Sequence, residues 1–233
     1  YTIEIDHDGT LAESQDFSIV VSGGVISSLG NEITFAMLGD FGDGSSSEAA
    51  VANLVKSWNP EFITTVGDNR YGGISFDTAV GQYFCDFLAD AGNGPNCNGN
   101  GSAENLFFPS PGNHDYTDGG GINEYLNYFT LPGSGVSSSN TSGSERYYDF
   151  IKGEVHFFMI DSQGALTSSA DATAQQNWLQ TQLAASTSTW KVVMLHHAPF
   201  SSANHGSNTS MQWPYAAWGA DVVLAGHDHT YER

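Results

Sequence analysis

Basic residues are scarce in this sequence. Only 6 lysines and arginines stand against 26 aspartates and glutamates, which gives a formal net charge of -20. Because binding to a nucleic-acid backbone needs basic patches, this composition argues against nucleic acid as a partner. The same charge repels anionic ligands, so a site for an anion would need local cations such as metal ions.

Long apolar runs are also missing. The longest, at 192–195 and 222–225, are interrupted by His or Gly, well short of the ~20 residues that cross a bilayer. We therefore expect no membrane span. A chain of 233 residues with 39% hydrophobic content can bury one sizeable core, which predicts one main domain with a small appendage.

Cysteine occurs only twice, as Cys85 and Cys97, and the second lies in a stretch rich in Gly and Asn at 91–101. The spacing fits no zinc motif. We predict a disulfide, with two free thiols as the alternative, and a disulfide favours an oxidising compartment. With the acidic surface, this predicts a secreted or cell-surface protein. The chain starts at Tyr1 without Met, so we expect a processed or excerpted product.

The first 24 residues have two short runs of alternating apolar and polar residues, 1–5 and 17–21, joined by a turn that contains Gly. This pattern predicts a β-hairpin. The segment resembles the closing strands of β-sandwich modules beside catalytic domains in secreted bacterial proteins. We therefore expect residues 1–30 to be the tail of an upstream module or a linker, and residues 31–233 to be the main domain.

From residue 33 onwards, apolar strands alternate with helical stretches, which predicts an α/β domain. The expected strands are 33–38, 62–66, 106–108, 147–151, 155–160, 191–195 and 222–224, with helices at 49–58 and 174–184. Ser45 and Glu48 form a candidate capping box before the first helix.

Polar clusters follow five of these strands, where ligands bind in α/β sheets. They are Gly39-Asp40-Phe41-Gly42, Gly67-Asp68-Asn69-Arg70-Tyr71, Gly112-Asn113-His114-Asp115, His196-His197-Ala198-Pro199 and Gly226-His227-Asp228-His229. Carboxylates, an amide oxygen, imidazoles and a phenol suit zinc, iron or manganese better than a thiolate-preferring ion.

The order GDxG, GDxxY, GNHD, His before x-Pro, and GHxH over residues 33–233 resembles the purple acid phosphatases, a branch of the calcineurin-like metallophosphoesterases. The small tartrate-resistant type is the nearer comparison. Many other members of the superfamily have a metal-binding His where this chain has Gly42, and Tyr71 supplies a phenol instead. The resemblance implies an α/β fold with a two-sheet β-sandwich flanked by helices in four αββα layers.

The resemblance also implies a ligand set for two metal ions. Asp40, Tyr71 and His229 would bind Fe(III); Asn113, His197 and His227 would bind a divalent Fe, Zn or Mn ion; and Asp68 would bridge them. His197 is chosen over His196 because the family's ligand immediately precedes the x-Pro pair. His196 would then be a packed neighbour or an orienting residue.

The implied reaction is hydrolysis of a small phosphate monoester by a metal-bound hydroxide. His114, beside Asn113, would donate a hydrogen bond to the phosphate, and His205 would protonate the leaving alkoxide. One alternative is a phosphodiesterase or nucleotide hydrolase with the same centre, since fold does not fix function. Another is an extracellular structural or adhesive protein that retains a phosphatase scaffold.

The sequence leaves the oligomeric state undecided. Members of the resembled family continue past the last His motif with further strands, whereas this chain stops at Arg233, so we expect a piece of a longer protein without its last strands.

Overall fold

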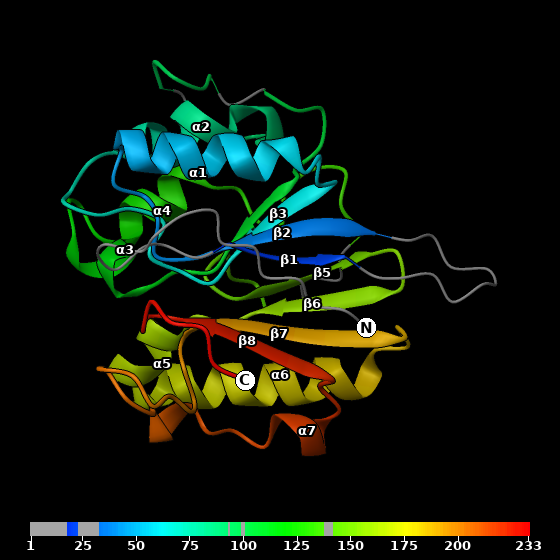
Figure 1. The fold of residues 1–233 in the computed structure, drawn as a ribbon. Coiled ribbons are helices and arrows are strands. Elements are labelled where there is room, and N and C mark those ends of the chain that lie inside the picture. Colours follow the sequence, from blue (N-terminus) through cyan, green and yellow to red (C-terminus); the bar gives the residue numbers. More distant parts are fainter. Residues whose placement is uncertain (1–17, 23–32, 93, 99–100, 138–141) are drawn as a thin grey trace.

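Two four-stranded sheets form the centre of the molecule (Figure 1). The computed structural model describes residues 18–22, 33–92, 94–98, 101–137 and 142–233. The first sheet has the order β1 (Ser18–Ser22), β2 (Thr34–Leu38), β3 (Phe62–Thr65) and β4 (Phe107–Pro109). The second has the order β5 (Tyr148–Lys152), β6 (Val155–Met159), β7 (Trp190–His197) and β8 (Val222–Gly226).

Both sheets begin with an antiparallel pair and continue in parallel. β1 pairs antiparallel with β2, and β5 pairs antiparallel with β6. The pairs β2–β3, β3–β4, β6–β7 and β7–β8 are parallel. Parallel neighbours bring their carboxyl ends to one edge of a sheet, so the loops after them can share a site.

Helices cover the outer faces of the two sheets (Figure 1). Above the first sheet lie α1 (Ser46–Ser57) and three short consecutive helical segments, η1 (Asp77–Gly81), α2 (Gln82–Phe84) and η2 (Cys85–Phe87). Below the second lie α5 (Ser162–Thr167), α6 (Ser169–Ala185), η3 (Thr209–Met211) and α7 (Tyr215–Trp218). α3 (Asn113–Thr117) and α4 (Ile122–Tyr128) follow β4. This is the α/β four-layer arrangement expected from the sequence.

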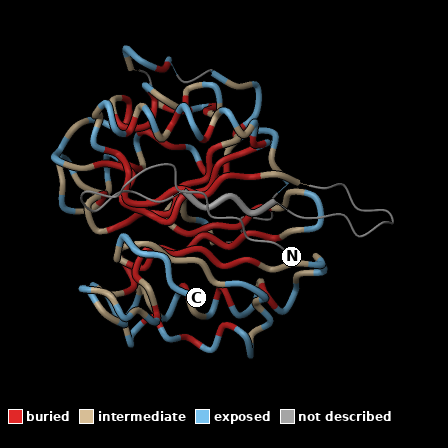
Figure 2. The backbone as a smooth tube through the Cα atoms, in the orientation of Figure 1, coloured by how far each residue is buried: buried red, intermediate tan, exposed pale blue. Residues whose placement is uncertain are grey.

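Aromatic side chains fill the space between the sheets. The ring of Phe62 meets those of Phe150 and Phe157 edge-on, with centroids 6.1 and 5.6 Å away, and Phe108 stacks on Phe150 at 3.8 Å. A second core lies between the second sheet and its helices, where Leu179 packs with Val193. β2, β3, β4 and β6 are mostly buried, because apolar area is removed from water on both of their faces, whereas β8 is only partly buried (Figure 2).

The sequence predicted the strands from residue 33 onwards to within two residues at each end. Ser45 caps α1 as expected, since its hydroxyl accepts the N–H groups of Ser47 and Glu48. The carboxylate of Glu48, however, accepts the N–H of Gly44 rather than that of the cap residue itself. The short elements between residues 77 and 87 were not predicted.

The Cys85–Cys97 disulfide is confirmed, with a Cα–Cα distance of 5.4 Å. In the part of the chain that is described, no helix is both long and apolar enough to cross a bilayer. Of the predicted hairpin, the run 1–5 lies outside the described residues, while Ser18–Ser22 forms β1 and pairs with β2. The proposed boundary near residue 30 stays a prediction.

Candidate metal centre

Four residues of the strand-end motifs have a left-handed backbone. Asp40, Asp68, His227 and His229 have φ values of 56°, 50°, 77° and 49°. For residues other than glycine this conformation costs about 1–2 kcal/mol each, and it persists where the surrounding structure imposes it, commonly at functional sites. The chain thus turns sharply at the ends of β2, β3 and β8.

The first set of converging atoms is the tyrosine group, formed by Asp40, Asp68, Tyr71 and His229. Tyr71 Oη lies 3.4 Å from Asp40 Oδ1, 3.3 Å from Asp68 Oδ2 and 3.3 Å from His229 Nε2. His229 Nε2 is in turn 3.2 Å from Asp40 Oδ1. One phenol hydrogen cannot serve all of these acceptors at once.

The second set is the asparagine group, formed by Asp68, Asn113, His196 and His227. His196 Nε2 lies 2.9 Å from Asn113 Oδ1, 3.3 Å from Asp68 Oδ2 and 3.1 Å from His227 Nδ1. Ligands bound about 2.1 Å from one metal ion and at right angles to each other are about 3 Å apart. Both groups therefore have the spacing of donors around a cation, and Asp68 Oδ2 belongs to both.

Backbone N–H groups hold the other oxygens of the two aspartates. His227 N donates to Asp40 Oδ2 at 3.1 Å, and His114 N donates to Asp68 Oδ1 at 2.8 Å. These bonds leave Asp40 Oδ1 and Asp68 Oδ2 directed at the converging atoms. A carboxylate fixed in this way is preorganised for a cation.

His197 and His196 have different surroundings in the structure. His197 Nδ1 lies 2.9 Å from Ser162 Oγ at the start of α5, and the His197 ring lies 4.5 Å from the ring of His227. His196, expected to be a packed neighbour, has its Nε2 inside the asparagine group. Both imidazoles are within reach of a shared cation with His227, but only His196 also approaches the oxygens of Asp68 and Asn113 among the contacts described.

An irregularity at the end of β7 lies at the two histidines. Val192 and Met194 face the core between the sheets, whereas Val193 and Leu195 face α6. The register with β8 shifts between Leu195 and His197, so the alternation does not continue unbroken to the histidines. His196 reaches the edge of the first sheet, where its Nδ1 lies 2.8 Å from Val66 O.

The two histidines predicted to act on substrate lie on opposite sides of the centre. The ring of His114 is 4.4 Å from that of Tyr71, and its Nδ1 is 3.2 Å from Asp118 Oδ2. The ring of His205 is 4.2 Å from that of His227. One histidine thus flanks the tyrosine group and the other the asparagine group.

Gly42 stands where no side chain fits. A Cβ at this position would overlap the backbone of Asn69 and Arg70. Gly42 O accepts the N–H of Tyr71 at 2.6 Å, so the two loops are joined at this point. Because no side chain fits at position 42, Tyr71 provides the polar side chain on this side of the site.

Comparison with models of protein families identifies the family of this chain. The family model described as calcineurin-like phosphoesterase matches residues 33–231. The chain belongs to this family.

Individual relatives are distant. Purple acid phosphatase 15 of Arabidopsis thaliana is 27% identical over 221 residues, which are 85% of this chain and 40% of that protein. An uncharacterized protein of Mycobacterium tuberculosis is 30% identical over 148 residues, which are 54% of this chain and 27% of that protein. The chain therefore spans less than half the length of these relatives.

Solved structures share the fold of this phosphoesterase-family chain. GAP50, the anchor in the inner membrane complex of Plasmodium, superposes with a TM-score of 0.58 at 18% identity, over 83% of this chain and 65% of GAP50. The purple acid phosphatase PPD1 from yellow lupin seeds gives a TM-score of 0.55 at 14% identity, over 93% of this chain and 44% of PPD1. At these identities the likeness establishes the fold alone.

The electrostatics of this phosphoesterase-family site favour neutral imidazoles at two positions. Burial and the neighbouring imidazole of His196 lower the pKa of His197 to about 3, and the same causes lower that of His227 to about 4. Burial would also lower the pKa of His196, but the hydrogen bond and charge of Asp68 outweigh it and raise that pKa to about 9. In the metal-free protein, His196 therefore acts as the counter-charge to the carboxylates.

Sequence reasoning missed the residues that support the phosphoesterase-family motifs from behind. Asp115 is fully buried and accepts Asn69 N at 3.0 Å, Asn69 Nδ2 at 2.8 Å and Gly112 N at 2.8 Å. Burial, with the nearby charge of Asp68, raises the pKa of Asp115 to about 7. The buried Arg70 donates to Asp118 O at 2.6 Å, which fixes the residue that contacts His114.

Proposed function

We propose that this chain hydrolyses phosphate monoesters at a dinuclear metal centre. The observation that carries the proposal is the pair of four-donor groups that share Asp68 Oδ2. In this account the tyrosine group holds Fe(III) and the asparagine group holds a divalent Fe, Zn or Mn ion. His196 therefore replaces His197 as the proposed ligand, and His197 supports the ring of His227.

The donor types agree with that division. A phenolate with two carboxylates and one imidazole suits Fe(III), while an amide oxygen, two imidazoles and a shared carboxylate suit a divalent ion. Such a pair of cations, when bound, supplies hydroxide near neutral pH and stabilises charge on a transferring phosphoryl group. It would also offset the repulsion between a phosphate dianion and a chain of formal charge -20.

The protein's own groups would then orient the ester. The side chain of His114 is 38% exposed and is held by Asp118 at 3.2 Å, so its other ring nitrogen can donate to a phosphate oxygen. His205 is exposed and packs on the ring of His227, a proposed ligand. From this position it can deliver a proton to the leaving alkoxide.

The test is phosphate release from p-nitrophenyl phosphate and, separately, p-nitrophenol release from bis(p-nitrophenyl) phosphate, by wild type and by Asp68→Asn. We expect turnover of the monoester by wild type, little turnover of the diester, and loss of both in Asp68→Asn. Preferential turnover of the diester would make the chain a phosphodiesterase. Two bound metal ions without turnover of either ester would favour a scaffold role.

A secreted location is part of the same proposal. The Cys85–Cys97 disulfide supports it, because disulfides persist in oxidising compartments. Thiol-trapping mass spectrometry on protein taken directly from the source would test it. A reduced pair would contradict it.

A further inference from the structure

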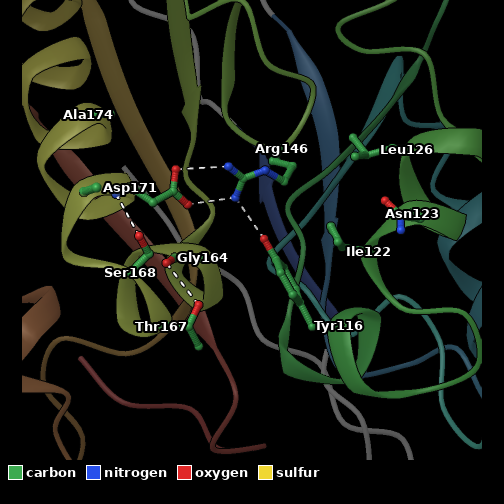
Figure 3. A pocket seen from close by; sticks show the side chains of 11 residues that line it. Tyr116, Ile122, Asn123, Leu126, Arg146, Gly164, Thr167, Ser168, Asp171 and Ala174 are labelled. Carbon is green, nitrogen blue, oxygen red and sulfur yellow. Dashed lines mark hydrogen bonds and ion pairs between the residues drawn. The ribbon is translucent and has the colours of Figure 1, made fainter.

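An open groove of about 650 Å³ separates α3 and α4 from α5 and α6 (Figure 3). Tyr116 and Ile122 line one side, and Gly164 and Asp171 line the other. Arg146 crosses between the two sides, with its guanidinium directed at both (Figure 3). We call the first sheet with its helices the first half of the molecule and the second sheet with its helices the second half. The two halves are joined here by polar contacts as well as by apolar packing.

The bridge consists of Tyr116, Arg146, Asp161 and Asp171, which we call the Arg146 clasp. Arg146 Nη1 donates to Asp171 Oδ2 at 2.8 Å and Nη2 donates to Asp171 Oδ1 at 3.0 Å, a bidentate pair. Arg146 Nη1 also contacts Tyr116 Oη at 2.9 Å and pairs with Asp161 Oδ2. The hydroxyl of Tyr116 donates to the same oxygen of Asp161.

Burial makes the clasp costly to break. The side chain of Asp161 is fully buried and that of Arg146 is 24% exposed. Removing one partner of a buried ion pair leaves an uncompensated charge, which is strongly unfavourable. Loss of the Arg146 guanidinium would therefore force Asp161 and its surroundings to rearrange.

On one side the clasp holds α3. That helix consists of five residues, Asn113–Thr117, so Tyr116 is less than one turn from Asn113 and His114. Asp115 ties the same helix to the first sheet through Asn69. Neighbouring residues of α3 thus attach it to the two halves separately, and Tyr116 provides the link to the second half.

On the other side the clasp holds the start of α5. Asp161 caps this helix, since its Oδ1 accepts Gly164 N at 2.8 Å. The next residue, Ser162, has its Oγ 3.0 Å from His197 N and 2.9 Å from His197 Nδ1. The clasp thereby reaches the end of β7, which carries His196.

We propose that Arg146 is a positioning residue for the divalent half of the metal centre. It holds Asn113 on α3 close to His196 on β7, so that both side chains can bind the same ion. This inference rests on the proposed dinuclear centre. The tyrosine group comes from the loops after β2, β3 and β8, and none of the described contacts of Arg146 reaches it, so the ferric half should not depend on the clasp.

The experiment is a comparison of Arg146→Met with Lys152→Met in the full chain. Lys152 is a matched control because it lies in β5, its side chain is 21% exposed, and it pairs with Glu104 at 3.7 Å. Each variant, loaded with iron, is titrated with Zn²⁺ against a chromophoric chelator. Iron content and visible absorption are recorded on the same samples.

We expect Arg146→Met to bind Zn²⁺ at least tenfold more weakly than wild type, in the range found for residues that orient metal ligands. Iron content and absorption should be retained, and Lys152→Met should match wild type. Equal Zn²⁺ affinity in Arg146→Met and wild type would overturn the inference. Parallel loss of both ions would also overturn it, because that result indicates general destabilisation.

Tyr116→Phe keeps the inference testable if Arg146→Met does not fold. It removes one hydroxyl and should weaken Zn²⁺ binding about threefold to tenfold, the effect of one lost hydrogen bond. Unchanged Zn²⁺ affinity in folded Tyr116→Phe would count against the inference. A wild-type chain that never holds two ions would refute the proposed function itself, and the inference with it.

Discussion

The imidazole Nε2 of His196 lies 2.9 Å from the amide oxygen of Asn113. One residue comes from the end of β7 in the second sheet and the other from α3, which follows the first. In the metal-free protein the protonated imidazole of His196 can donate to this oxygen. Loss of that proton would leave two atoms with lone pairs at the spacing of two ligands on one cation.

The neighbouring histidines give the first prediction. His196→Ala removes a donor of the asparagine group, so it should abolish tight binding of the divalent ion. His197→Ala removes only the support between Ser162 and the ring of His227 and should cost about tenfold in affinity. Zn²⁺ titration of both variants separates the two roles. Loss of the ion in His197→Ala with retention in His196→Ala would restore the choice made from the x-Pro pair.

Proton release gives the second prediction. Because the pKa of His196 is about 9 in the metal-free protein, its imidazole is protonated at pH 7.5 and must lose that proton to bind a metal ion. Affinity should therefore rise up to tenfold per pH unit until about pH 9 and then level off. His227, with a pKa of about 4, is already neutral and releases nothing.

Calorimetry of Zn²⁺ binding in two buffers with different ionisation enthalpies counts the protons. Tyr71→Phe protein is the suitable sample, because it removes the phenol proton from the count. Close to one proton per bound ion is expected. No release would contradict the assignment, since a site built on His197, with its pKa of about 3, would release none.

Local sequence patterns predicted most of the strands because each is a short apolar run that ends at polar residues or at a Gly or Pro. Asp40, Asp68 and Tyr71 could be identified because each lies just after such a run. The x-Pro pair favoured His197 as the ligand, whereas the fold brings His196 within 2.9 Å of Asn113 and 3.3 Å of Asp68. A local motif could not show which of the two histidines approaches these residues, because that depends on the register shift at the end of β7.

The Arg146 clasp had no comparable signal. Arg146 lies 30 residues from Tyr116, 15 from Asp161 and 25 from Asp171 along the chain. No local period connects these positions. Their meeting depends on how the two halves of the domain pack, which only the folded structure determines.

Replacement of Tyr71 gives the third prediction. In the iron-loaded wild type, charge transfer from the Tyr71 phenolate should give a visible absorption band. Tyr71→Phe should lose this band while Asp40, Asp68 and His229 still retain some iron, because only one of four donors is gone. Absorption and iron content measured on one sample test this. A band that persists in Tyr71→Phe would exclude Tyr71 as the chromophore.

The fourth prediction concerns His205. General-acid catalysis contributes about 10²–10⁴-fold where the leaving group is a poor one. His205→Ala should therefore impair an alkyl phosphate far more than p-nitrophenyl phosphate, whose leaving group needs no proton. The exposed neighbour Asn204 supplies the control, and Asn204→Ala should behave as wild type with both esters. Equal losses for the two esters in His205→Ala would remove the general-acid role.

The proposed centre depends on Asp68, whose carboxylate would be shared by both metal ions. The metal content per chain tests this dinuclear centre most directly. Elemental mass spectrometry on protein purified without chelators should find two metal ions per chain, one of them iron, and no more than one in Asp68→Asn. A wild-type chain that holds only one metal ion, even after iron and zinc are added, would contradict the dinuclear centre. A chain that binds no metal ion under the same conditions would contradict it too.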